Sequence, residues 1–149
     1  MSETRPFTYL LRVRYSECDP QNVVFNARYG DYADISATEF MRAVWGNYAD
    51  VVARGLDNQV VKLTMTWQSS ARFDDVLAIR VHASHIGTTS FTLSMVMHHH
   101  ETQREIARAE VIYVMVDNTT FKKCSIPDDM KASLSKGAHN RVVDHAGVL

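Results

Sequence analysis

One carboxylate in this sequence stands in a position suited to catalysis. Asp19 lies in the segment Cys18-Asp19-Pro20, before the apolar run Val23-Val24-Phe25 and the start of a predicted helix. A carboxylate in a turn can simply form local hydrogen bonds. Beside the free N–H groups of a helix N-terminus, it can instead deprotonate a water molecule or attack a carbonyl carbon. The residues themselves leave both interpretations open.

For the other reactive side chains the sequence favours structural roles. Glu17 is predicted to be solvated or salt-bridged at a strand end, and Glu39 to lie at the edge of the buried stripe of a helix. Cys18 has no histidine nearby in sequence that would lower the pKa of its thiol. The run His98-His99-His100 has no carboxylate or cysteine at ligand spacing, so we predict a solvated strand end and no metal site.

The composition narrows the functional classes. The chain has 149 residues, of which 46% are hydrophobic and 22% charged, with a formal net charge of −1. This size suits one domain with a single core, and the balanced charge predicts no nucleic-acid partner. The N-terminus lacks the layout of a signal peptide, and no apolar run is long enough to span a membrane. Cys18 and Cys124 are too few for a disulfide framework, so we expect a cytoplasmic protein.

The element that follows Asp19 is predicted to be a long helix. Apolar and small side chains recur there at i, i+3, i+4 and i+7 spacing for about four turns. They are Tyr29, Tyr32, Ala33, Ser36, Ala37, Phe40, Met41 and Val44. Asn26 is predicted as the N-cap, because its side-chain oxygen can accept from a backbone N–H of the first turn, and Gly46 as the stop. With Asn26 as the cap, Asp19 is free to point into a site.

Strands are predicted on both sides of this helix. Alternating apolar residues indicate a first strand over Phe7–Tyr15, and period two returns in four later runs. These runs are Val61–Trp67, Leu77–Ala83, Phe91–Met97 and Ile106–Val116. Pro127 is predicted to open a short helix. The order predicts a two-layer α+β fold with one helix on an antiparallel sheet, whose open edge favours self-association.

We expect one domain over residues 1–134 and a loosely ordered polar tail over residues 135–149.

Several motifs in this order resemble those of a known family. Tyr15 is followed by "ECDP", by Val23-Val24-Phe25 and by "NARY" at the helix start; "SSARFDDVLAIRV" spans residues 69–81, and Ser90-Phe91 begins a later strand. Together they resemble the hotdog-fold acyl-CoA thioesterases of the 4-hydroxybenzoyl-CoA thioesterase type, over most of Phe7 to Val116. The resemblance implies a curved five-stranded antiparallel sheet wrapped around one long central helix.

The resemblance also implies an active site between two subunits, at the N-terminus of the long helix. The catalytic acid of the family falls on Asp19, as base or nucleophile, and the oxyanion donor is a backbone N–H at or near Asn26. Phe25 and Tyr29 are expected to shape the acyl or pantetheine channel. The remaining expected substrate-binding residues are Val24, Thr89 and Ser90. We expect a homodimer or homotetramer that hydrolyses acyl-CoA and needs no cofactor.

Three departures from the family pattern keep alternatives open. Pro20-Gln21-Asn22 stands where many relatives have small residues, and Asn26 stands where some have histidine or tyrosine. Gly87-Thr88-Thr89 carries no charge, whereas certain relatives have basic residues there that hold the CoA phosphates. One alternative is therefore an acyl-carrier-protein thioesterase of lipid or polyketide synthesis. Another is a non-catalytic acyl-binding protein of the same fold.

Overall fold

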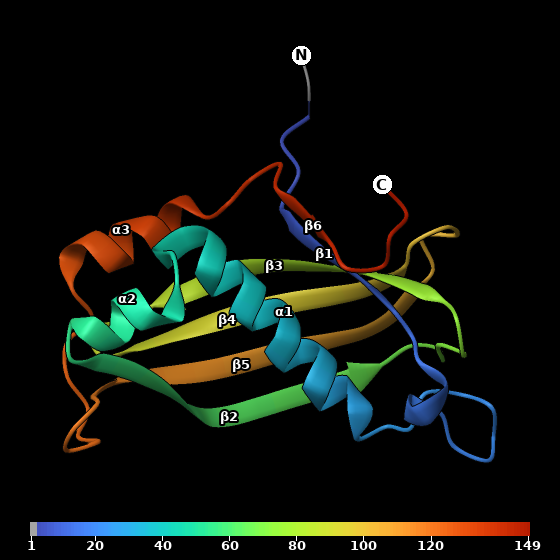
Figure 1. Ribbon diagram of the computed structural model, residues 1–149, viewed down its shortest axis with the longest axis horizontal. Helices are drawn as coiled ribbons and strands as arrows, with labels where there is room; N and C mark the ends of the chain where they lie inside the picture. The colour runs from blue at the N-terminus through green and yellow to red at the C-terminus, as the bar shows by residue number, and fades with distance from the viewer. Residues whose placement is uncertain (1–2) are drawn as a thin grey trace.

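The computed structural model describes residues 3–149. They fold into a sheet with one long helix lying across one of its faces (Figure 1). The helices are α1 (Arg28–Trp45), α2 (Tyr48–Ala53) and α3 (Asp128–Lys136), with a short 3-10 turn, η1, at Tyr15–Glu17. The strands are β1 (Phe7–Arg12), β2 (Leu56–Trp67), β3 (Val76–Ile86), β4 (Ser90–His99), β5 (Glu105–Asp117) and β6 (Val142–Asp144). The predicted α+β architecture with a long central helix is confirmed.

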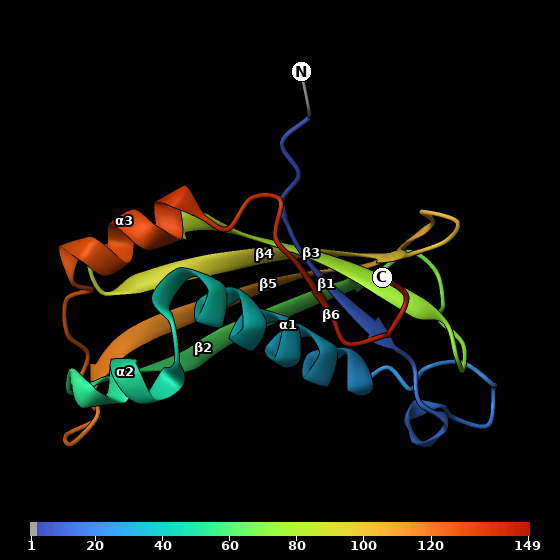
Figure 2. The ribbon, with the colours of Figure 1, turned by 45° about the horizontal axis from the view of Figure 1, so that its top comes forward.

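The sheet has the strand order β2-β5-β4-β3-β1-β6. All neighbouring pairs are antiparallel except β1 and β6, which are parallel. The sheet therefore has six strands, one more than the sequence predicts. The extra strand comes from the tail after Ser135, which does not stay loosely ordered but lies along β1 (Figure 2).

The central helix α1 follows the predicted stripe closely. Its buried residues are Tyr29, Tyr32, Ala33, Ser36, Ala37 and Phe40. It ends at Gly46, as predicted, where φ of +83° suits a residue without a side chain. The prediction that Asn26 is the N-cap is wrong, because the N-cap is Ala27 and no side chain caps the helix. A backbone turn replaces the cap: the Arg28 N–H donates to the Phe25 carbonyl at 2.8 Å.

The predicted first strand is too long at its C-terminal end. β1 stops at Arg12, and the chain then turns through η1, which leaves Tyr15 80% exposed. β2 begins earlier than predicted, at Leu56, because α2 is short and Gly55 redirects the chain at φ of +77°.

The two edges of the sheet differ in length and character. On one side, the three-residue β6 covers β1. On the other side, the twelve-residue β2 has a partner only in β5 within the described chain. Four of its large apolar side chains are about half exposed: Val60, Val61, Leu63 and Trp67. Within residues 3–149, no helix is both long and apolar enough to cross a membrane.

Candidate active site

Asp19 sits at the base of a tight loop between η1 and α1. Its backbone N–H donates to the Val23 carbonyl at 2.9 Å, and the Asn22 N–H donates to the Asp19 carbonyl at 2.9 Å. Asn22 adopts φ of +63°, a left-handed conformation that asparagine tolerates better than most residues. Pro20-Gln21-Asn22 thus forms the turn that follows Asp19.

The two oxygens of the Asp19 carboxylate differ in their contacts. Its Oδ1 accepts a hydrogen bond from the Gln21 backbone N–H at 2.8 Å, which is the turn role. Its Oδ2 has no hydrogen-bond partner among the described residues. One carboxylate oxygen therefore holds the loop, and the other is available to a ligand or a water molecule.

Asp19 opens on a cavity of about 310 Å³. Of the predicted site residues, the structure brings Asp19, Val24, Asn26 and Tyr29 together around this cavity. Phe25 lies between Val24 and Asn26 in sequence but does not line the cavity, and the residue is 45% exposed. The rest of the lining is Gln21, Val23, Trp67, Gln68, Ser69 and Ser70.

Tyr29 forms a rigid wall of this cavity. Its ring packs edge-to-face against Trp67, with centroids 6.0 Å apart, and against Tyr32 at 5.7 Å. Its hydroxyl oxygen accepts a hydrogen bond from the Ala71 N–H at 3.3 Å. Burial raises the pKa of Tyr29, so this hydroxyl stays protonated at neutral pH.

The residues contributed by the end of β2 are missing from the sequence prediction. Trp67, Ser69 and Ser70 lie far from Asp19 in sequence, and only the packing of β2 beside α1 brings them to the cavity. The available signal was the tryptophan at the end of an alternating strand, directly before the "SSARFDD" motif. That motif is part of the resemblance, but nothing local to it indicates contact with Asp19.

Two backbone donors lie free at the entry to α1. The N–H groups of Phe25, Arg28 and Tyr29 donate to the carbonyls of Glu17, Phe25 and Asn26, respectively. The N–H groups of Asn26 and Ala27 have no acceptor within residues 3–149. They sit at the positive end of the α1 dipole, where a developing negative charge is stabilised.

Thr89 and Ser90 lie at the opposite end of the sheet. Trp67 pairs with Ala107, and Ala107 with Met97, whereas Ser90 begins β4 seven residues before Met97. At about 3.3 Å per residue, the two rows are about 23 Å apart. Within one chain, Thr89 and Ser90 therefore do not belong to the cavity beside Asp19.

The sequence predicts that Glu17 is either solvated or salt-bridged. The structure shows that it is salt-bridged and buried. It is 6% exposed and pairs with the Arg14 guanidinium at 2.9 Å. Burial acts to raise its pKa, but hydrogen bonds from Arg14 and Tyr32 outweigh burial and hold the pKa below its usual value.

The remaining candidates occupy structural positions. Burial, followed by the charges of Glu17 and Asp19, raises the pKa of the Cys18 thiol, which disfavours the nucleophilic thiolate. Glu39 pairs with Arg42 at 3.4 Å. The side chains of His98 and His99 have different neighbours. His99 contacts the Asp75 carboxylate at 3.4 Å, while His98 lies beside Arg80.

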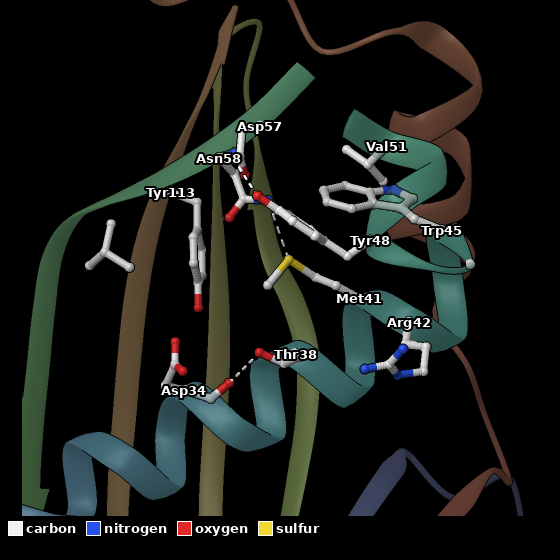
Figure 3. Close-up of a pocket in the computed structure, with 12 residues that line it drawn as sticks. Asp34, Thr38, Met41, Arg42, Trp45, Tyr48, Val51, Asp57, Asn58 and Tyr113 are labelled. Atoms are coloured by element: carbon white, nitrogen blue, oxygen red, sulfur yellow. Dashed lines mark hydrogen bonds between the residues drawn. The ribbon is translucent and has the colours of Figure 1, made fainter. Parts of the chain in front are cut away.

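A second cavity, of about 260 Å³, lies between α1, α2 and β2 (Figure 3). Its apolar lining includes Met41, Trp45, Val51 and Val60. Tyr113 is 3% exposed and points its hydroxyl toward Asp34, without a hydrogen bond to any described residue (Figure 3). Burial, with a smaller contribution from the Asp34 charge, raises the pKa of Tyr113.

Comparison with known proteins identifies the family of this chain. The family model described as "Thioesterase-like superfamily" matches residues 13–134. The chain belongs to the thioesterase-like superfamily. The hotdog-type fold expected from the resemblance is confirmed, as is membership of a family of thioester hydrolases.

Individual known proteins are similar to this chain over most of their length. The acyl-CoA thioester hydrolase YbgC of Escherichia coli is 26% identical over 133 residues, which is 89% of this chain and 98% of that protein. A hypothetical protein of Aquifex aeolicus aligns with a TM-score of 0.79 at 25% identity, over 87% of this chain and 99% of its own. A Staphylococcus aureus protein solved in complex with CoA aligns with a TM-score of 0.84 at 13% identity, over 91% of this chain and 85% of its own.

Proposed function

We propose that the chain hydrolyses acyl-CoA thioesters to a free acid and CoA. The observation that carries this proposal is the cavity at the start of α1, which both Asp19 and Asn26 line, while the Oδ2 of Asp19 has no hydrogen-bond partner among the described residues. The unpaired N–H groups of Asn26 and Ala27 would form the oxyanion hole. The names of YbgC and of the CoA-bound Staphylococcus aureus protein support acyl-CoA as the substrate.

Hydrolysis of the thioester would follow one of two routes. In the first, Asp19 takes a proton from a water molecule that attacks the thioester carbonyl, and the C–S bond then breaks to release CoA thiolate. In the second, the Asp19 carboxylate attacks the carbonyl and forms a mixed anhydride with loss of CoA thiolate, and water then hydrolyses the anhydride. The amide of Asn26 can orient a carbonyl or a water molecule in either route, but it cannot relay a proton as imidazole does.

The acyl group is proposed to run along α1 into the second cavity. Asp34 is five residues beyond Tyr29, or about 7.5 Å along the helix axis. The side chains of Met41, Trp45 and Val60 offer an apolar lining there. The free hydroxyl of Tyr113 would bind a polar group on the acyl chain.

We propose that a second copy of the chain completes the site by pairing along β2. The exposed apolar side chains of this edge and its lack of a second partner strand support pairing there. A two-fold axis through an antiparallel β2 pair reverses the second sheet. The partner's Thr89 and Ser90 would then approach the Trp67 end of this subunit, which one chain alone does not achieve.

Turnover on matched substrates tests the function. Wild-type protein is assayed on acyl-CoA esters of increasing chain length and on the same acyl groups carried by acyl-carrier protein. We expect faster release of the acid from CoA. Preference for the carrier would favour the alternative that the neutral Gly87-Thr88-Thr89 turn keeps open. Binding of acyl-CoA with no hydrolysis at any chain length would contradict an enzymatic role.

A further inference from the structure

Glu17 is the one buried charged side chain among residues 3–149, and neither route of the proposed reaction uses it. Burial of a carboxylate is unfavourable unless hydrogen bonds and an opposite charge compensate. An apolar side chain would fill the same space without that requirement. The contacts of the Glu17 carboxylate indicate what a charged group at this buried position does.

The Glu17 carboxylate connects the end of β1 with α1. On one side it accepts from the Arg14 backbone N–H at 2.7 Å, from Arg14 Nε at 3.1 Å and from Arg14 Nη2 at 2.9 Å. On the other side its Oε1 accepts from the Tyr32 hydroxyl at 2.9 Å. Hydrogen bonds to a charged acceptor are stronger than neutral ones, so this connection is firm.

The backbone of Glu17 extends the connection to the Asp19 loop. Its carbonyl accepts from the Phe25 N–H at 2.9 Å, which joins the two arms of the loop at their base. One step further, Cys18 and Val24 form an isolated antiparallel bridge, and the Val24 N–H donates to the Ala71 carbonyl at 2.9 Å. Glu17 thus lies two residues from Asp19 and directly opposite the segment that enters α1.

Tyr32 transmits this restraint to the first turns of α1. It follows Tyr29 by three residues, on the same face of the helix, and the two rings pack edge-to-face at 5.7 Å. Tyr29 in turn lines the cavity beside Asp19. The Glu17–Tyr32 hydrogen bond therefore joins the residues that precede the Asp19 loop to the first turns of α1.

We propose that Glu17 is a positioning residue that holds the Asp19 carboxylate against the N-terminus of α1 through Tyr32. Its effect on turnover rests on the proposed thioesterase function, whereas its effect on the loop does not. Displacement of a catalytic group by about 1 Å is enough to lower a rate by about 100-fold.

The test compares Glu17→Gln and Tyr32→Phe with a matched control, Tyr9→Phe. Tyr9 is also a buried tyrosine, but its hydroxyl hydrogen-bonds to His145 at 2.8 Å and not to Glu17. We expect the first two variants to lower kcat by up to about 100-fold with KM unchanged. Tyr9→Phe is expected to keep wild-type kcat. Tyr32→Phe removes a single oxygen, so it keeps the test valid if Glu17→Gln does not fold.

Amide hydrogen exchange of residues 17–25 provides a second readout that needs no activity. Tyr32→Phe is expected to speed exchange at the N–H groups of Asp19, Val24 and Phe25, and Tyr9→Phe is expected to leave it unchanged. Unchanged exchange in Tyr32→Phe overturns the proposal, as does faster exchange with wild-type kcat. A wild-type protein that hydrolyses no thioester contradicts the proposed function alone, since the exchange measurement still decides the role of Glu17.

Discussion

A charge at the centre of β2 is expected to dissociate the proposed dimer. Val61 lies near the middle of β2 and is 59% exposed in the single chain. Full burial of a valine contributes about 1.5 kcal/mol, so burial of this exposed part contributes about 0.9 kcal/mol per chain, or about 1.8 kcal/mol per dimer. Val61→Lys removes that contribution and places two like charges near the two-fold axis, which costs about 1–2 kcal/mol more. The total of about 3 kcal/mol corresponds to a dissociation constant about 100-fold higher.

Sedimentation velocity over a concentration series measures this change. Val142→Lys serves as the matched control, because Val142 is a 45% exposed valine on β6, at the other edge of the sheet. We expect the control to dimerise as the wild type does. The reasoning is refuted if Val61→Lys dimerises with wild-type affinity, or if the β6 substitution weakens the dimer equally.

Three further predictions concern the core, the buried carboxylate and the second cavity. Phe40→Ala is expected to lower the free energy of unfolding by about 3–5 kcal/mol in urea denaturation, because Phe40 is fully buried and packs edge-to-face on Phe7 at 5.6 Å. The folded-state pKa of Glu17 is lowered, so its stabilisation is present above the unfolded-state pKa and lost as pH falls through the folded-state pKa. Acid unfolding below about pH 4 should therefore be shallower in Glu17→Gln, and an identical acid limb would contradict this. Tyr113→Phe should raise KM for acyl groups with a polar substituent but not for plain alkyl chains; equal changes for both would remove Tyr113 from the acyl pocket.

The sequence predicts well where one periodicity runs over a long segment. The stripe from Tyr29 to Val44 identifies α1, because an uninterrupted apolar face has one efficient way to be buried. It predicts poorly where tertiary contacts decide. Tyr15 continues the alternation of β1, yet the chain has already turned there. The tail forms β6 because β1 offers it an open edge, which a polar composition does not indicate.

The candidate site shows the same division. The structure places Val24, Asn26 and Tyr29 of the local motif around one cavity with Asp19, because they lie within a single loop and helix start. Phe25 of the same motif does not line that cavity. The predicted N-cap role of Asn26 is wrong, because its side chain does not cap the helix. Asn26 instead precedes a helix without a side-chain cap, and the N–H groups of Asn26 and Ala27 are free among the described residues. Trp67 required the packing of β2 beside α1, and no local pattern contains that information.

Replacement of Asp19 by asparagine tests the central claim most directly. Asp19→Asn keeps an oxygen that can accept from the Gln21 N–H, so the loop is expected to fold, while the carboxylate is lost. Glu39→Gln is the control, because it neutralises a carboxylate of α1 that pairs with Arg42 and does not line the cavity beside Asp19. The account predicts that kcat/KM for acyl-CoA falls at least about 100-fold in Asp19→Asn, equivalent to about 3 kcal/mol of transition-state stabilisation, and is unchanged in Glu39→Gln. Near wild-type turnover by Asp19→Asn, or a larger loss in Glu39→Gln, would contradict it.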